Sequence, residues 1–359
     1  MHLATIGPMS TAMSAGDGTL AALFASSPSH FVTSPLYCRL VQVVAADDRL
    51  LDIAARARPG QMPQNMLLAS VHYLLLRDRR DRRGQREQDE LAAWYPSLGG
   101  TATGDPGPAF TAFCLRRRAE IIDLVRRRLV QTNVVKRAIA VRLGMAEVAS
   151  LTSEPVTFVE VGCSAGAHLR FDDYRCDLAG RTWGKASSPV VVSTAWREGT
   201  PPDLGPLPVI RDRVGVDLHP VDVTDPDERL WLRALVWPEN TEQAALQDEA
   251  LRVVADDPPR TVQGDVVDVL PQVVAEVPYG TPVVVFHSAT RLHVAADRRE
   301  AFDAAIADIA LDHELFHLSY EVFPGSGELA FGLELRRGAG PGRLLAIGDG
   351  HGEWMSGPA

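Results

Sequence analysis

The chain has few cysteines and no long apolar run. No two of its four cysteines form a Cys-x-x-Cys pair, which argues against a structural zinc site and against a disulfide framework. No apolar stretch approaches the roughly 20 residues needed to cross a bilayer. The first residues also lack the basic segment and apolar core of a secretory signal. We therefore expect a cytoplasmic protein with no membrane contact.

Positive charge is also in short supply. The 359 residues include 46 acidic ones against 36 lysines and arginines, which gives a formal net charge of −10. Broad nucleic-acid binding needs a basic face, so we expect no nucleic-acid partner. The charge-dense stretch at 77–90 mixes both signs, and a solvated helix end followed by a loop explains it more simply than a binding patch. Hydrophobic residues make up 46% of the chain, enough for a sizeable core.

The pattern of apolar residues changes near residue 151. Residues 1–16 are small and polar, and we expect them to be disordered. Residues 17–150 show mainly helical spacing. From 151 to 359, short β-branched runs alternate with helical segments, which predicts a mostly parallel sheet with helices on both faces. The predicted fold class is α/β, a helical N-terminal region before a doubly wound domain, with a Pro/Gly-rich insertion at about 178–212 and an antiparallel terminal hairpin.

The stretch VEVGCSAGAH, residues 159–168, follows the first predicted strand. Glu160 comes at the end of that strand, and Gly162, Ser164 and Gly166 follow at every second position. In an open parallel sheet, ligands bind beyond the carboxyl ends of the strands, and glycines let the backbone approach them closely. The alternative is a tight turn that packs against its own helix. Cys163, inside the turn, is a candidate nucleophile only if a base lies beside it.

Polar residues also follow the later predicted strands. His287 comes just past a buried strand, where its near-neutral pKa suits it to accept a substrate proton, and a hydrogen-bonded core histidine is the alternative. Glu321 ends the next strand, as a ligand for a substrate amine or as a paired structural acid. Asp217 and Asp265 follow the second and third strands, and a helix N-cap is the alternative for each. His287 and Glu321 are the candidate catalytic residues.

Three further positions are candidates for contact with a substrate. Gln-Thr-Asn at 131–133 is polar within an otherwise periodic helix, which predicts tertiary partners for Asn133. His168 is expected on the first turn of the helix after the glycines. Ser288 follows His287 directly. We find no histidine spacing that predicts a metal site.

The spacing Glu-x-Gly-x-Ser-x-Gly differs from the Gly-x-Gly-x-x-Gly of dinucleotide-binding folds. It resembles the first motif of class I S-adenosylmethionine-dependent methyltransferases, with Ser164 in place of the central glycine. The resemblance implies a Rossmann-like, methyltransferase-like domain in which Asp217 accepts hydrogen bonds from the ribose and Asp265 meets the adenine amino group. It places His287 and Ser288 near the transferred methyl group. The implied cofactor-binding residues are Glu160, Gly162, Ser164, Gly166, Asp217 and Asp265.

Longer segments resemble a family of bacterial proteins, DUF2332. They are SPLYCRL, ARPGQMPQNMLLASVHYLLL, YPSLGG, VQTNVVKR, VEVGCSAGAHLRFDDY, GVDLHPVDVTDPDERLWLRALVWPE and VVVFHSA. The resemblance covers about residues 20–350 and implies a methyltransferase-like Rossmann domain with a helical N-terminal part. His168 stands where an asparagine is common in that family.

Three functions are compatible with these features. The first is an enzyme that binds S-adenosylmethionine and transfers its methyl group to a small molecule. The second is a cofactor-independent biosynthetic enzyme on the same fold, catalysing elimination or cyclisation. The third is a non-catalytic binding or scaffold subunit that works with a partner chain or as a homo-oligomer. Fold alone does not choose among them.

Overall fold

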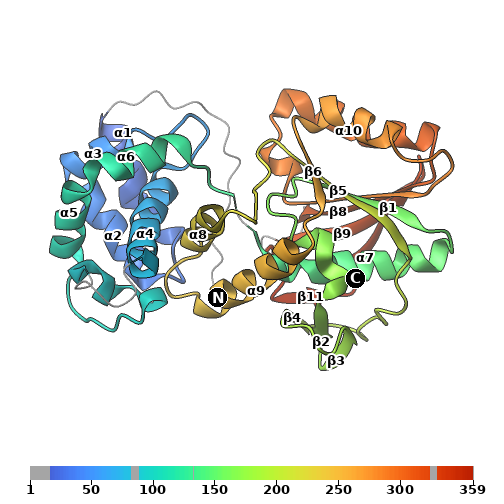
Figure 1. Ribbon diagram of the computed structural model, residues 1–359, viewed down its shortest axis with the longest axis horizontal. Coiled ribbons are helices and arrows are strands. Elements are labelled where there is room, and N and C mark those ends of the chain that lie inside the picture. The colour runs from blue at the N-terminus through green and yellow to red at the C-terminus, as the bar shows by residue number, and fades with distance from the viewer. Residues whose placement is uncertain (1–16, 82–88, 132, 324–329, 359) are drawn as a thin grey trace. The chain divides into compact units, whose positions relative to one another are not determined.

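The computed structural model describes residues 17–81, 89–131, 133–323 and 330–358 (Figure 1). The predicted disordered segment 1–16 lies outside these residues. The chain divides into two compact parts, a helical part of residues 1–132 with 225–245 and a sheet part of residues 133–224 with 246–359. The fold class, mixed α/β with a large and mostly parallel sheet, is confirmed at this level.

The helical part is arranged around α4, Pro63–Asp81. Every residue of α4 from Met66 to Leu76 is buried, which explains why its sequence has no polar face over those positions. Polar side chains begin two other helices: Ser34 accepts a hydrogen bond from the backbone of Tyr37, and Asp47 accepts one from Arg49. The other helices are α1 Asp17–Ser26, α2 Pro35–Ala45, α3 Asp48–Ala54, α5 Gly107–Arg116, α6 Arg118–Arg127 and α8 Pro226–Leu235, with 3₁₀ turns at Ser27–Ser29, Glu90–Trp94 and Pro96–Leu98.

Residues 225–245 belong to this helical part, although they lie between two strands in the sequence. Trp231 and Ala234 of α8 are buried in the same apolar core as α4. Glu239 accepts hydrogen bonds from the Ser34 hydroxyl at 2.5 Å and from the Leu36 backbone at 2.8 Å. The predicted boundary at 150/151 thus differs from the observed division, because 133–150 pack with the sheet and 225–245 pack with the helices. Helix α9, Thr241–Asp256, runs across the division.

The described strands of the sheet part lie in the order β3-β2-β4-β11-β10-β9-β8-β7-β1-β5-β6. The five from β6 to β8 are parallel, and β9 and β10 continue the sheet as an antiparallel hairpin, as predicted. The predicted insertion at 178–212 contributes β3 and β4 at the far edge. The strands are β1 Val156–Val161, β2 Arg175–Leu178, β3 Arg181–Gly184, β4 Val191–Trp196, β5 Ile210–Asp217, β6 Arg260–Gln263, β7 Val283–Ser288, β8 Leu315–Phe323, β9 Ala330–Arg337, β10 Arg343–Gly348 and β11 Trp354–Ser356.

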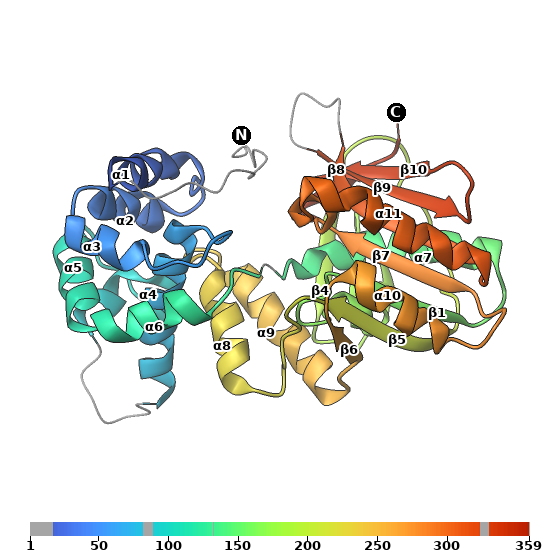
Figure 2. The same cartoon turned by 90° about the horizontal axis from the view of Figure 1, so that it is seen from above.

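Helices cover both faces of the parallel strands (Figures 1 and 2). α7, Ala138–Leu151, packs on one face, where an added Cβ on Gly144 would come within 2.7 Å of the Leu318 side chain of β8. α10, Val266–Ala275, and α11, Arg299–Ala307, cover the other face through side chains such as Leu270 and Phe302. Short 3₁₀ turns lie at Val135–Arg137, His168–Asp173, Arg291–His293, Ala296–Arg298 and Asp308–Leu311.

The periodic helix predicted around residues 131–133 is interrupted. α6 ends at Arg127 because Arg128 has an extended backbone, and a helix resumes only at Ala138. Asn133 therefore lies in a connecting segment, and the prediction that it lies within a helix is wrong. Of the described helices, none has the length and apolar character needed to span a membrane.

Candidate functional site

The chain reverses direction across the sheet between β1 and β7. After β1 the chain first forms β2, β3 and β4 at the far edge, then β5 and β6 on one side of β1, and it returns to the other side of β1 to form β7 and β8. In open α/β sheets, this reversal is where ligands bind, beyond the carboxyl ends of the strands. The structure brings Glu160, Asp217 and His287 to this edge, at or next to the ends of β1, β5 and β7.

The glycine turn after β1 is held by the protein itself. Gly162, Ser164 and Gly166 all have positive φ angles, of 76°, 48° and 71°. Each amide of residues 162–166 already donates to a protein acceptor: those of Gly162 and Cys163 to Val216 O, that of Ser164 to Asp217, that of Ala165 to Asn133 and that of Gly166 to Cys163 O. A Cβ on Gly162 would meet the Thr290 side chain at 2.4 Å, so Thr290 occupies the space that this glycine leaves.

Asp217 orients the turn from the end of β5. Its Oδ2 accepts the Ser164 N–H at 2.8 Å, and its Oδ1 accepts the His219 N–H at 2.8 Å. A carboxylate has about four acceptor positions, so each oxygen keeps one for a further donor. The half-buried Asp217 can therefore still accept hydrogen bonds from a ligand.

Glu160 and His168 form a buried pair beneath the turn. The Glu160 carboxyl is 2.8 Å from His168 Nδ1, and His168 Nε2 is 3.0 Å from the carbonyl oxygen of Val134. Because that carbonyl can only accept, Nε2 carries a hydrogen, and one proton is shared between Nδ1 and the carboxyl. Burial raises the pKa of Glu160, while His168 opposes the rise. The second oxygen, Oε2, is buried and has no partner in the described part of the chain.

Asn133 is a second buried residue that reaches the turn. Its Nδ2 donates to the Ser164 hydroxyl at 3.0 Å, and its Oδ1 accepts the Ala165 N–H at 3.3 Å. The tertiary partners predicted for Asn133 are thus backbone and side-chain groups of the turn. Both ring nitrogens of His168 and both ends of the Asn133 amide have protein partners, and a substrate-binding role for either stays a prediction.

Asp265 begins α10 as its N-cap. Its Oδ1 accepts the Val267 N–H at 3.0 Å, and its Oδ2 pairs with Arg298 at 2.9 Å. These are the contacts of the alternative considered from the sequence. A contact between Asp265 and an adenine group remains untested.

His287 connects two residues of β8. Its Nδ1 lies 2.7 Å from Glu321, and its Nε2 lies 2.9 Å from Nε2 of His317. Glu321 also accepts the N–H groups of Thr290 and Arg291. Burial acts to raise the pKa of Glu321, but the hydrogen bond and charge of His287 together with the backbone N–H groups of Thr290 and Arg291 lower it below its ordinary value. Burial and the neighbouring His287 lower the pKa of His317 to about 3, so His317 is neutral at physiological pH.

His287 therefore has no ring nitrogen free for a substrate, and any proton it takes up passes through Glu321 or His317. Glu321 was predicted to end its strand. In the structure it lies within β8, which continues to Phe323. Sequence reasoning missed His317 as a partner. The period of two in His317, Ser319 and Glu321 on β8 was the available indication that they share one face.

Cys163 and Ser288, two further site candidates predicted from the sequence, both have buried polar atoms. The Cys163 thiol is buried, and burial raises its pKa well above the ordinary value, so it is not an activated nucleophile. Ser288 Oγ is buried without a hydrogen-bond partner among the described residues. Among those residues, no group of three or more histidine, cysteine, aspartate or glutamate side chains is arranged to hold a metal ion.

Comparison with known proteins identifies a family. The family model described as "uncharacterized protein conserved in bacteria (DUF2332)" matches residues 22–356. A search of curated proteins gives no significant match. Because the family model covers nearly the whole sequence, the chain belongs to the DUF2332 family.

Proposed function

We propose that the chain is an enzyme that modifies a small molecule, with S-adenosylmethionine bound at the carboxyl edge of β1 and β5. The observation that carries the proposal is the pair of carboxyl groups, Glu160 and Asp217, at the ends of these adjacent strands. Asp217 accepts a hydrogen bond from the glycine turn that follows Glu160. The order β6-β5-β1-β7-β8, with the reversal at β1, supports assigning this part to the Rossmann-like folds.

The hydrogen bonds of the turn narrow the class of ligand. Phosphate-binding turns present free backbone N–H groups to the anion. In this turn all five amides from Gly162 to Gly166 are already used, which argues against a dinucleotide held through its pyrophosphate. A nucleoside without phosphate, bearing ribose hydroxyls and a cationic group, suits the two carboxyl groups better.

Two residues fit such a nucleoside. Asp217 keeps acceptor positions for the ribose hydroxyls, and its carboxylate is held in place by two N–H groups. Glu160 Oε2, buried and without a described partner, can accept a hydrogen bond from an amino group. S-adenosylmethionine, when bound, supplies an electrophilic methyl group on a sulfonium centre. The chain's own contribution is to orient the reactants and exclude water.

Calorimetric titration of the full chain tests this proposal. We expect S-adenosylmethionine and S-adenosylhomocysteine to bind, and Asp217→Asn to weaken binding by about tenfold, which corresponds to the loss of one charged acceptor. Asp212→Asn is the matched control, because Asp212 is exposed near the other end of β5. No binding heat up to about 1 mM ligand contradicts the proposal.

One observation favours the cofactor-independent alternative. Thr290 fills the space beside Gly162, where a ligand would approach the turn. Thr290→Ala removes that side chain, so a variant that binds S-adenosylhomocysteine when the wild type does not would show a site of the right shape closed by Thr290. If neither protein binds it, cofactor-independent chemistry becomes the leading proposal.

A further inference from the structure

Arg137 is a half-buried cation without an acidic partner among the described residues. Its Nε donates to the carbonyl oxygen of Gly350 at 2.7 Å, and its Nη1 makes a long contact of 3.5 Å with the carbonyl oxygen of Ser288. Its guanidinium carbon lies 5.7 Å from the centre of the Phe331 ring. No carboxylate of the described residues is within ion-pair distance, and Nη2 has no hydrogen-bond acceptor among them. The side chain is thus held firmly while one edge of its fork stays unused.

Two other half-buried arginines of the sheet part have acidic partners, whereas Arg299, like Arg137, donates to carbonyl oxygens. Arg213 pairs with Asp172 at 2.7 Å, and Arg170 pairs with Asp173 at 2.6 Å. Burial of a charge is costly unless the charge is compensated. Burial lowers the pKa of Arg137, but arginine keeps its charge in proteins.

The acids nearest to Arg137 are engaged elsewhere. Glu321 is bonded to His287 and to two backbone amides. Asp349, which is 4% exposed, accepts the N–H groups of residues 351, 353 and 354 and so folds the turn after β10. Both carboxylates contribute to the potential at Arg137, yet neither contacts it.

Ser288 supplies a second unused polar group beside Arg137. Its carbonyl oxygen is the acceptor of Arg137 Nη1, and its Oγ is buried without a described partner. Ser288 is in register with Tyr320, whose ring packs against Phe331, the same ring that Arg137 covers. In-register residues of adjacent strands point to the same face, so the hydroxyl lies on the face of the sheet that Arg137 covers.

We propose that Arg137 and the Ser288 hydroxyl form a binding site for one anionic group, a carboxylate or a phosphate, at the carboxyl edge of the sheet. A guanidinium fork binds either anion through two parallel N–H groups, and a hydroxyl adds a third donor. Two sources supply this chemistry: the carboxylate of the cofactor's amino-acid part, or an acidic group on the substrate. The site stands whether or not the cofactor binds.

Titration of the full chain with inorganic phosphate and with acetate tests the site. We expect saturable binding of at least one probe to the wild type, and Arg137→Gln to weaken it about tenfold, the loss expected for a hydrogen bond to a charged group. Arg137→Lys keeps the charge without the fork and should give an intermediate affinity. Ser288→Ala should also weaken binding by about tenfold, because a hydroxyl that donates to an anion makes a charge-assisted hydrogen bond.

Arg197→Gln is the matched control, since Arg197 is exposed, stacks on Trp354 in the same part of the chain, and carries the same charge. It should leave the affinity unchanged. Equal weakening by Arg197→Gln would reduce the effect to net charge and overturn the site. So would unchanged binding in a folded Arg137→Gln variant, or the absence of saturable binding of both probes.

The source of the anion is identified by competition. If S-adenosylhomocysteine binds and displaces phosphate, and Arg137→Gln weakens it as well, the cofactor supplies the carboxylate. If phosphate binds equally with and without S-adenosylhomocysteine, the anion belongs to the substrate. Phosphate binding that depends on Arg137 in a protein that does not bind S-adenosylhomocysteine would separate a failed cofactor proposal from a valid anion site.

Discussion

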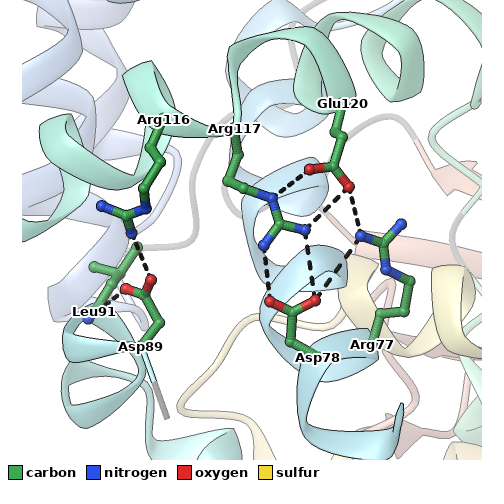
Figure 3. Close-up of polar contacts among 7 residues, drawn as sticks. All are labelled: Arg77, Asp78, Asp89, Leu91, Arg116, Arg117 and Glu120. Atoms are coloured by element: carbon green, nitrogen blue, oxygen red, sulfur yellow. Dashed lines mark hydrogen bonds and ion pairs between the residues drawn. The ribbon is translucent and has the colours of Figure 1, made fainter. Parts of the chain in front are cut away.

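The charged residues of the helical part and the polar residues at the edge of the sheet differ in their burial and in how completely they are hydrogen-bonded. In the helical part, Arg117 lies between Asp78 and Glu120, and Arg77 reaches Glu120 at 2.6 Å (Figure 3). Nearby, Asp89 accepts hydrogen bonds from the Arg116 side chain and from the backbone N–H of Leu91. Each acid faces an oppositely charged side chain, and all of these groups are at least partly exposed.

At the edge of the sheet, polar groups are buried and only partly satisfied. Glu160 is 3% exposed and shares one proton with His168, and its Oε2 has no hydrogen-bond partner within the described ranges. Ser288 Oγ is likewise buried and unpaired among the described residues. Surface ion pairs contribute little to stability, whereas an unsatisfied buried polar group costs free energy and needs a compensating role. Buried polar atoms without a described partner also occur in the helical part, such as the hydroxyls of Tyr37 and Tyr95. The candidate site is therefore assigned to Glu160 and Ser288 because they lie at the carboxyl ends of parallel strands, and the ion pairs have a structural role.

The largest effect is expected at the turn. Gly162→Ala adds a Cβ against the β-branched Thr290 at a φ of 76°, so overpacking and backbone strain should together destabilise the sheet part by about 2 to 4 kcal/mol. Hydrogen exchange localised by mass spectrometry should show the loss in the strands around β1. The double variant Gly162→Ala with Thr290→Ala should regain only the part of the stability that the steric clash removes. If the single and the double variant are destabilised equally, Thr290 does not pack against Gly162 in this way.

The arrangement of strands follows from features that a sequence displays. β1 and β7 are mostly apolar and rich in β-branched residues, with a polar residue at or next to the end, as a buried parallel strand requires, whereas β5 shows this pattern only in its last four residues. The membership of residues 225–245 in the helical part could not be predicted in this way. The amphipathic spacing of α8 requires an apolar partner but does not identify it, and the partner lies more than a hundred residues away.

The sequence predicted where the site residues lie in the sheet better than it predicted their hydrogen-bond partners. Glu160, Asp217 and His287 do lie at one edge, because the carboxyl ends of parallel strands coincide. Their hydrogen bonds depend on register and on the connecting segment, which pattern reasoning does not give. Arg137 had the appearance of one more arginine on a solvated helical face. Only the tertiary structure reveals that it lacks an acidic partner in the part of the chain that the structure describes.

A second prediction concerns His72 in the helical part. The ring is buried between the carbonyl oxygen of Ala234 and the Ser97 hydroxyl, and burial lowers its pKa to about 4. Since the unfolded state binds this proton near pH 6.5, stability should fall as pH decreases from 6.5 to 4, by up to about 3 kcal/mol. His72→Asn should be less stable at neutral pH but should lose this dependence. The same slope in both proteins, followed by denaturant unfolding, would rule out His72 as its source.

Substitutions of Ser164 separate the contribution of backbone strain to stability from that of its hydrogen bond within the turn. Ser164→Ala loses the bond from Asn133 and keeps the positive φ, so it should cost about 1 to 2 kcal/mol. Ser164→Gly loses the same bond but removes the strain, so its cost should be smaller by about 1 kcal/mol. Thermal unfolding of the two variants side by side measures the difference, and a costlier glycine would mean that the backbone is not strained.

The smallest effect is expected in the ion-pair network. Arg117 and Arg77 lower the pKa of Glu120 to about 2, so the stabilising interaction is present above pH 4.5 and is lost as pH falls toward 2. Because the Glu120 side chain is 43% exposed, solvent screens it, and Glu120→Gln should cost less than about 1 kcal/mol in low salt and less still in high salt. Asp123→Asn, on the same helix but paired with Arg127 alone, is the matched control and should cost less. A cost for Glu120→Gln that matches Gly162→Ala and persists in high salt would overturn the contrast between the two parts, because it would make the charged network as critical as the buried turn.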